Sequence, residues 1–228
     1  LVVEADAAGT CPAAFRIFNA DGSAAMQCGN GARCIAAFLT QDHDFPQEFT
    51  LASPAGAMAA RVSGDRVRVG MGLPEFTPAR IPFAGAAVEA ADYRIEVEGE
   101  TVTLGALSMG NPHAVILVED TGAAPVETLG PAIAQHPAFP AGVNVGFLEV
   151  VSRHGGRLRI FERGAGETAA CGSGACAAMV TGRRLGLFDA EVALDLAGGT
   201  LVISWRGANE PVWLEGPANR VYEGHTTL

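Results

Sequence analysis

The chain carries one stretch of its own sequence twice. "RIFNADGSAAMQCGNGARC" (16–34) overlies "RIFERGAGETAACGSGACA" (159–177) when the chain is shifted by 143 residues, the separation of Cys28 from Cys171. In the same frame Gly56 falls on Gly199, Val69 on Val212 and Pro74 on Pro217. Agreement in one frame over such a distance indicates an internal duplication. The sequence therefore predicts two homologous halves, each a strand, a Gly-rich turn, a helix and a meander of strands.

Local patterns predict the same elements in both halves. Runs of apolar, β-branched and aromatic residues before Gly-rich turns predict strands at 15–18 and 157–161. Ala-rich stretches at 32–39 and 175–185 predict helices with little polarity, buried on most sides. Hairpins are predicted at 59–71 and 199–216. The predicted fold class is α/β (α+β), with two pseudo-symmetric halves in which a β-sheet wraps around a central helix.

Each repeat places a cysteine, Cys28 or Cys171, at the start of its predicted helix. Free N–H groups and the helix dipole stabilise an anion there, so we expect a thiol pKa below the usual value of about 8.5. Two such thiols facing one cleft form an opposed acid and base, which suits inversion at a carbon acid. The helix N–H groups would hold the substrate carboxylate and stabilise the carbanion. The alternative is that both are core thiols, and their recurrence in matched frames weighs against it.

Composition excludes several classes of function. A net charge of −10 leaves no basic surface for a nucleic acid or an anionic membrane. The best apolar run, "AVILV" at 114–118, is too short to span a bilayer. Five cysteines, an odd number, favour a reducing compartment, here the cytoplasm, over a disulfide framework. Their spacing is not that of a zinc site, so no metal is expected.

The repeated motifs resemble those of a known family. Together with "SMGNPHAV" (108–115) and "GVNVGF" (142–147), they are similar to diaminopimelate epimerase, a cofactor-independent enzyme that converts LL-diaminopimelate to the meso form. Proline racemases and phenazine-biosynthesis isomerases share that family's fold. The racemases typically carry a His where this chain has Asn30. The resemblance implies epimerisation of an amino acid for lysine and peptidoglycan precursor synthesis, with no cofactor.

The resemblance also implies roles for individual residues. Cys28 and Cys171 take the acid and base roles, and His113 and Glu162 are candidates for tuning their protonation. The residues implied to bind substrate are Asn19, Gly29, Asn30, Asn111, Asn144, Glu162, Arg163, Gly172 and Ser173. Diaminopimelate is a long zwitterion, so its distal end needs Arg for the carboxylate and Asn or Glu for the ammonium. Two alternatives remain open: the Asn residues could form turns, and Glu162 with Arg163 could be an exposed ion pair.

The repeat also predicts how the chain is divided. The first half is expected at 1–71 and the second at 72–217, with 218–228 returning to complete the first half. Compared with the second half, the N-terminal part of the first half is expected to be missing, because the counterpart of Met109 falls before Leu1.

The remaining predictions concern assembly and the other cysteines. Tyr222 lies beyond the second repeat, and the resemblance places it at a homodimer contact, where a ring can be buried and its hydroxyl paired. Alternatively, Tyr222 caps the core of its own domain. Cys11, Cys34 and Cys176 are interpreted as structural. Two other functions stay open: a racemase of another amino acid, such as a proline derivative, and an inactive member that only binds ligand.

Overall fold

The computed structural model describes residues 1–4, 9, 11–18, 22, 24–25 and 28–225. The strands are β1 (Val2–Glu4), β2 (Ala13–Phe18), β3 (Ala24–Ala25), β4 (Glu48–Ser53), β5 (Gly56–Ser63), β6 (Arg66–Gly70), β7 (Tyr93–Val97), β8 (Glu100–Ser108), β9 (Pro112–Val118), β10 (Asn144–Ser152), β11 (Gly155–Glu162), β12 (Gly166–Thr168), β13 (Glu191–Leu196), β14 (Gly199–Ser204) and β15 (Trp213–Pro217). The helices are α1 (Gly29–Asp42), α2 (Val126–Ala134) and α3 (Gly172–Arg184), with a 3-10 turn at Pro78–Arg80.

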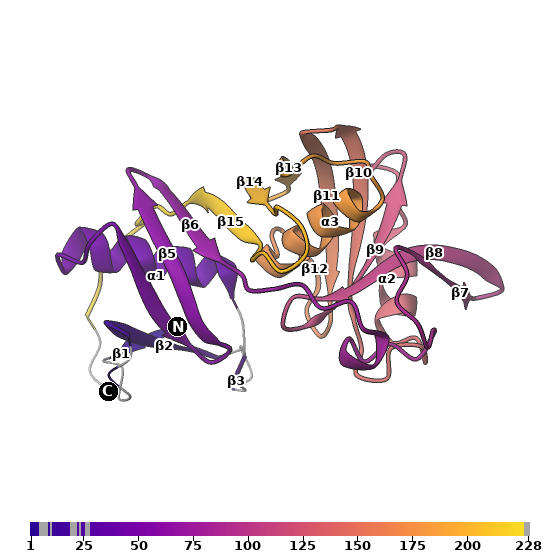
Figure 1. The fold of residues 1–228 in the computed structure, drawn as a ribbon, viewed down its shortest axis with the longest axis horizontal. Coiled ribbons are helices and arrows are strands. Elements are labelled where there is room, and N and C mark those ends of the chain that lie inside the picture. Colours follow the sequence, from indigo (N-terminus) through magenta and orange to yellow (C-terminus); the bar gives the residue numbers. More distant parts are fainter. Residues whose placement is uncertain (5–8, 10, 19–21, 23, 26–27, 226–228) are drawn as a thin grey trace.

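The strands form two lobes that β15 joins (Figure 1). Hydrogen bonds connect them in the order β1-β2-β4-β5-β6-β15-β14-β13-β11-β10-β9-β8-β7, with β3 beside β2 and β12 beside β11. Strand β15 pairs antiparallel with β6 of the first lobe and with β14 of the second. The two halves are therefore connected through backbone hydrogen bonds as well as through packing.

The duplication is visible in the strand register. Strand β2 runs parallel to β4 with Ala13 opposite Leu51, and β11 runs parallel to β13 with Gly156 opposite Leu194. These are the same pair of positions, 143 residues apart. The β2–β3 and β11–β12 pairs also correspond in register, as do the hairpins β4–β5 and β13–β14. The prediction of two homologous halves is confirmed at the level of individual residue pairs. The hairpins predicted at 59–71 and 199–216 are present as the antiparallel pairs β5–β6 and β14–β15.

Each lobe contains one central helix. Helix α1 packs against β5, β6 and β15, and α3 packs against β8, β9, β10 and β14. In α3 every residue from Gly172 to Gly182 is buried. Small side chains suit such a helix, because they let strands approach it from several directions at close-packed density. The expected Ala-rich buried helices are present, both beginning three residues before the Ala-rich stretches.

Helix α2 and the C-terminal tail lie outside the duplicated stretches. Helix α2 was not predicted, and its sequence contains Gly130 and Pro131, which both disfavour helix. After β15, Ala218 N–H donates to the Asp65 carbonyl and Arg220 pairs with Asp42 of α1. The described part of the C-terminal tail thus contacts the first half, while the division of the chain near residue 72 stays a prediction. None of the described helices has the length and apolar character of a membrane span.

Candidate active site

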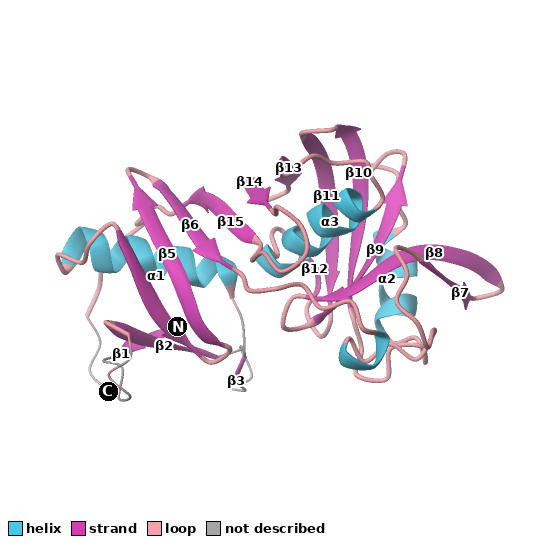
Figure 2. Cartoon of the chain, viewed as in Figure 1, coloured by secondary structure: helices cyan, strands magenta, loops and turns pink. Residues whose placement is uncertain are grey.

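The starts of helices α1 and α3 meet at the junction of the two lobes (Figure 2). Cys28 is the N-cap of α1, and its Sγ accepts a hydrogen bond from Gly31 N–H at 3.2 Å. Cys171 is the N-cap of α3. A Cβ built on Gly172 would lie only 3.5 Å from the Cα of Gly29, so the two backbones approach with no side chain between them. The predicted placement of both cysteines at helix N-termini is confirmed.

Leu214 of β15 lies against both helix starts. A Cβ on Gly29 would lie 2.7 Å from Leu214 Cδ2, and a Cβ on Gly172 would lie 2.9 Å from the same atom. Real Cβ atoms essentially never come so close to another heavy atom. A larger residue at either position would have to displace the Leu214 side chain, so packing favours glycine there, in addition to any approach of a substrate carboxylate. The strand that joins the lobes also sets the spacing between the two helix starts.

A second group of predicted residues lies at one end of strands β9, β10 and β11. Asn144 pairs with His113 across the parallel strands β10 and β9. Its Nδ2 donates to the Pro112 carbonyl at 3.2 Å, and its Oδ1 accepts from Arg163 N–H at 3.0 Å. Asn111 Oδ1 lies 3.0 Å from His113 Nε2. These contacts bring Asn111 and His113 together with Asn144 and Arg163, which come from distant parts of the sequence.

Glu162 and Arg163 do not form the ion pair that was one alternative. The guanidinium of Arg163 donates to the Ala141 carbonyl, and Glu162 accepts from the Thr168 hydroxyl. Glu162 instead interacts electrostatically with the Cys171 thiol. This links the group at the strand ends to the start of α3. Thr168 supports the carboxylate and was not found from the sequence, where it carries no motif.

Burial controls the protonation of Cys171. Desolvation, and after it the neighbouring Glu162 carboxylate, raise the pKa of this thiol to about 12. The Ser173 hydroxyl, 3.6 Å from Sγ, and the Gly174 N–H oppose the rise. The expected lowering of the thiol pKa is therefore wrong for Cys171, because desolvation outweighs the helix N-terminus. Cys171 is a protonated thiol at neutral pH.

His113 is neutral as well. It is 1% exposed, and burial lowers its pKa to about 3, with the Arg163 charge acting in the same direction. A neutral imidazole can accept or donate a proton on either nitrogen, depending on its tautomer. Its ring is held by Asn111 and does not touch a carboxylate in the described residues. The predicted role of His113 in tuning the thiols stays a prediction.

The remaining predicted residues divide into three groups. Asn30 joins the two halves, because its Nδ2 donates to the Ala170 carbonyl at 3.4 Å. Cys176 is fully buried, as expected of a structural thiol, whereas Cys34 is exposed and Cys11 is half-buried. Cys34 was expected to be structural, and its exposed side chain does not fit that expectation. Asn19 lies outside the described residues.

Tyr222 does not cap a core. Its side chain is 85% exposed, next to Val221 at 90%. Together with Cys34 and Phe38 of α1, these two side chains line a pocket on the outside of the first lobe. The alternative that Tyr222 covers its own domain is thus wrong, and the homodimer contact stays a prediction.

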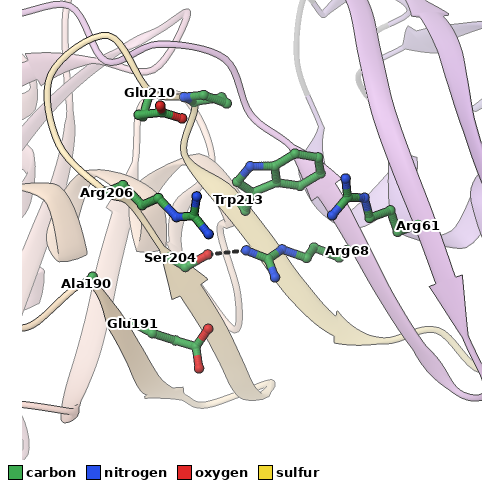
Figure 3. A pocket seen from close by; sticks show the side chains of 9 residues that line it. Arg61, Arg68, Ala190, Glu191, Ser204, Arg206, Glu210 and Trp213 are labelled. Carbon is green, nitrogen blue, oxygen red and sulfur yellow. Dashed lines mark hydrogen bonds between the residues drawn. The ribbon is translucent and has the colours of Figure 1, made fainter.

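A larger pocket of about 450 Å³ lies elsewhere, on the outer face of the sheet (Figure 3). Trp213 points into it, and neighbouring residues of a strand point to opposite faces. The pocket is therefore on the opposite side of β15 from Leu214. Arg68 donates to Ser204 Oγ at 2.5 Å, which connects β6 with β14 across β15. Of the residues predicted to bind substrate, none that the structure describes lines this pocket.

Comparison with known sequences identifies relatives over most of the chain. The sequence profile of the family described as "Diaminopimelate epimerase" matches residues 1–77 and 105–221. A "Diaminopimelate epimerase" from Ectopseudomonas mendocina (strain ymp) is 51% identical over 216 residues, which cover 94% of this chain and 78% of the relative. One from Xanthomonas euvesicatoria pv. vesicatoria (strain 85-10) is 51% identical over 226 residues, covering 98% of this chain and 80% of the relative.

Solved structures share the architecture at much lower identity. A hydroxyproline epimerase from Agrobacterium vitis, crystallised with trans-4-hydroxy-L-proline, has a TM-score of 0.66 and 20% identity, over 93% of this chain and 69% of that one. A phenazine biosynthesis PhzF family protein from Enterococcus faecalis has a TM-score of 0.63 and 17% identity, over 95% and 78% of the two chains. These likenesses establish the fold, a mixed α/β arrangement in two halves.

Proposed function

This chain belongs to the diaminopimelate epimerase family, and on that premise we propose that it interconverts LL- and meso-diaminopimelate by proton transfer between two thiols and the α-carbon. The observation that carries the proposal is the meeting of two cysteine-capped helix starts, one from each half. Relatives that bear this name at about half identity over nearly the whole chain support the substrate assignment. The chain is accordingly an amino-acid epimerase, an isomerase.

The proposed reaction needs one thiolate and one thiol at the same time. The thiolate removes the α-proton from one face of the substrate, and the electron pair of that C–H bond is left on the α-carbon. The opposed thiol gives its proton to the other face, where the same electron pair forms the new C–H bond. The thiol and thiolate have then exchanged roles, and the substrate has inverted.

The helix starts would stabilise the intermediate. Backbone N–H groups in the first turn of a helix have no partner in the preceding turn and can donate to an anion. Gly31 and Gly174 already direct their N–H groups at the two cysteine thiols. A substrate carboxylate between Gly29 and Gly172 would face both sets of donors, which hold the negative charge that develops next to the α-carbon. Ser173 and Asn30, one residue further along each helix, complete the polar surroundings of this position.

The group at the strand ends would bind the distal part of the substrate. Arg163 supplies a guanidinium for the distal carboxylate, and Glu162 with Asn111 and Asn144 supplies acceptors for the ammonium. Because Glu162 also interacts with Cys171, substrate binding and thiol protonation share one carboxylate. Asn19 is proposed as a further substrate ligand on the basis of its motif alone.

We further propose the cellular setting. The reaction would supply meso-diaminopimelate for lysine and peptidoglycan precursor synthesis in the cytoplasm, without a cofactor. A homodimer through the surface around Tyr222 is the proposed assembly. Support comes from the family and from the exposure of Tyr222 and Val221.

The direct test follows the α-proton. The protein is incubated with LL-diaminopimelate in D₂O, and NMR measures both the loss of the α-proton signal and the appearance of the meso form. Cys28→Ala and Cys171→Ala should each abolish epimerisation, because each inversion needs both partners. Cys11→Ala, a cysteine outside the site, is the matched control and should retain the parental rate.

Three outcomes would contradict the proposal. A parent protein that exchanges no α-proton is not an epimerase of this substrate, as expected of an inactive member. Faster exchange with L-proline than with LL-diaminopimelate would favour the racemase alternative. Near-parental turnover by Cys28→Ala would rule out the two-thiol mechanism.

A further inference from the structure

Arg33 breaks the symmetry between the two central helices. Helix α1 reads Gly29-Asn30-Gly31-Ala32-Arg33, and α3 reads Gly172-Ser173-Gly174-Ala175-Cys176. A shift of 143 residues thus places a guanidinium in one half where the other has a small thiol. Arg33 is nevertheless only 7% exposed, and the other buried residues of the first helical turn, Gly29, Gly31 and Ala32, are small. A long cation in such a place needs a reason other than packing.

The contacts of Arg33 lead to the other half. Its Nη1 donates to Asn30 Oδ1 at 2.9 Å, and Asn30 Nδ2 donates in turn to the Ala170 carbonyl at 3.4 Å. Ala170 directly precedes Cys171. On its other side the guanidinium packs against β15, where a Cβ on Gly216 would lie 3.3 Å from Arg33 Nε. The orientation of Asn30 toward the second cysteine turn is therefore fixed by Arg33.

The charge of Arg33 has no carboxylate partner. Among the described residues no ion pair involves it, and its Nε is buried without a hydrogen-bond partner. Burial lowers its pKa, and the positive charge of Arg66 acts in the same direction. The groups that raise the pKa of Arg33 are three thiols, Cys34, Cys176 and Cys28. An arginine remains charged even so, and an uncompensated buried cation is strongly unfavourable.

Only one of these thiols is suited to balance the cation. Cys176 is completely buried, and burial raises its pKa so far that it stays protonated. Cys34 is exposed, where solvent screens its charge. Cys28 is half-buried at a helix N-terminus, and its Sγ already accepts a hydrogen bond from Gly31 N–H. A thiolate at Cys28 would have both the helix start and the guanidinium to stabilise it.

We propose that Arg33 is a positioning residue for the epimerisation: it holds Asn30 across the junction of the halves and stabilises Cys28 as the thiolate. Cys171, buried beside Glu162, is then the thiol of the pair. The assignment rests on the proposed two-thiol function and adds to it a physical cause for the difference between two pseudo-symmetric cysteines. It also explains why a buried arginine occupies the position that corresponds to Cys176.

The test compares two substitutions at one position. Arg33→Met keeps much of the apolar stem and removes the charge, whereas Arg33→Lys keeps a charge without the planar fork. The rate of iodoacetamide alkylation at Cys28 is measured from pH 5 to 10 by peptide mass mapping. Cys11, which is not among the groups acting on Arg33, serves as internal reference. Epimerisation kinetics and circular dichroism are recorded on the same samples.

The expected result has two parts. Arg33→Met should move the midpoint of Cys28 alkylation to higher pH, and should lower kcat/KM about 10- to 100-fold. Arg33→Lys should restore the alkylation midpoint and only part of the rate, because Asn30 is still misplaced.

A structural role would give a different pattern. If both variants lose activity equally and the Cys28 midpoint is unchanged in each, Arg33 does not stabilise the thiolate and the proposal is overturned. If Arg33→Met does not fold, Arg33→Lys is the deciding variant. A shift in its midpoint of Cys28 alkylation would contradict the proposal. The alkylation measurement does not depend on turnover, so a parent protein without epimerase activity would refute the proposed function separately.

Discussion

Substitution of Gly172 by alanine tests the close approach of the two helix starts. The new Cβ would lie 2.9 Å from Leu214 Cδ2, 3.3 Å from Asn30 Oδ1 and 3.5 Å from Gly29 Cα. Alanine gains up to about 1 kcal/mol of helix propensity over glycine. Overpacking of a tight core costs about 1–3 kcal/mol. Leu214 is fully buried and cannot swing into solvent, so the steric cost should prevail.

The expected net effect is a loss of about 1–2 kcal/mol in the free energy of unfolding, measured by urea titration. Activity should fall further, about 100-fold in kcat/KM, because the two cysteine turns are pushed apart. Gly70→Ala is the matched control. A Cβ there would meet nothing nearer than 3.8 Å, so its stability should change by only a few tenths of a kcal/mol.

A double-mutant cycle identifies the clashing atom. Leu214→Ala alone should cost about 2–5 kcal/mol, as for other buried leucines. The double variant with Gly172→Ala should lose at least about 1 kcal/mol less than the sum of the single losses, because the space vacated by Leu214 accepts the new methyl. Strict additivity, or a Gly172→Ala protein as stable and active as Gly70→Ala, would refute the proposed contact.

Three further predictions concern protonation and assembly. The pKa of His113 is about 3 in the fold and about 6.5 in the unfolded chain, so the free energy of unfolding falls as the pH drops below 6.5. Between pH 7 and 5 the parent should lose about 2 kcal/mol more of this free energy than His113→Gln, as measured by urea unfolding. The thiol of Cys171 has the opposite dependence, because its pKa is raised to about 12 in the fold. The free energy of unfolding should fall by about 1.4 kcal/mol per pH unit above pH 9, and it should fall less steeply in Cys171→Ala. Tyr222→Ala should dissociate the proposed dimer in sedimentation, with Val221→Ala as the neighbouring control; an unchanged dimer, or a parent already monomeric at micromolar concentration, would exclude the contact.

Much of the fold was predictable because the sequence contains it twice. A match between Cys28 and Cys171 in one frame specifies equivalent strands, turns and helices without reference to any contact, and the observed registers follow the same offset. Helix α2 lies outside the duplicated stretch and contains Gly130 and Pro131, so neither the repeat nor local propensity indicates it. Its formation depends on tertiary packing, against β10 and β11.

The position of the two cysteines at helix starts was predictable, but their electrostatics were not. Motifs select Cys171 and Glu162, yet burial, which decides the thiol pKa, depends on how the strands close over α3. Arg33 was not predicted, because the two repeats do not share it. A difference between the two repeats could have indicated it. Arg33 is a charged residue in a helix start made otherwise of small residues, and the second repeat has Cys176 at that position.

The symmetry of the backbone and the asymmetry of the side chains serve different parts of one reaction. Inversion requires N–H donors for the negative charge that develops on the substrate carboxylate, which two equivalent helix starts provide. It also requires one thiol and one thiolate, and two identical thiols would titrate as a coupled pair with no fixed assignment. The copies differ in charge near their cysteines: Arg33 replaces the counterpart of Cys176, and Glu162 replaces the counterpart of Asn19. In the proposed mechanism, the Arg33 cation in the first half and the Glu162 carboxylate in the second act in the same direction and favour the proton on Cys171 until substrate arrives.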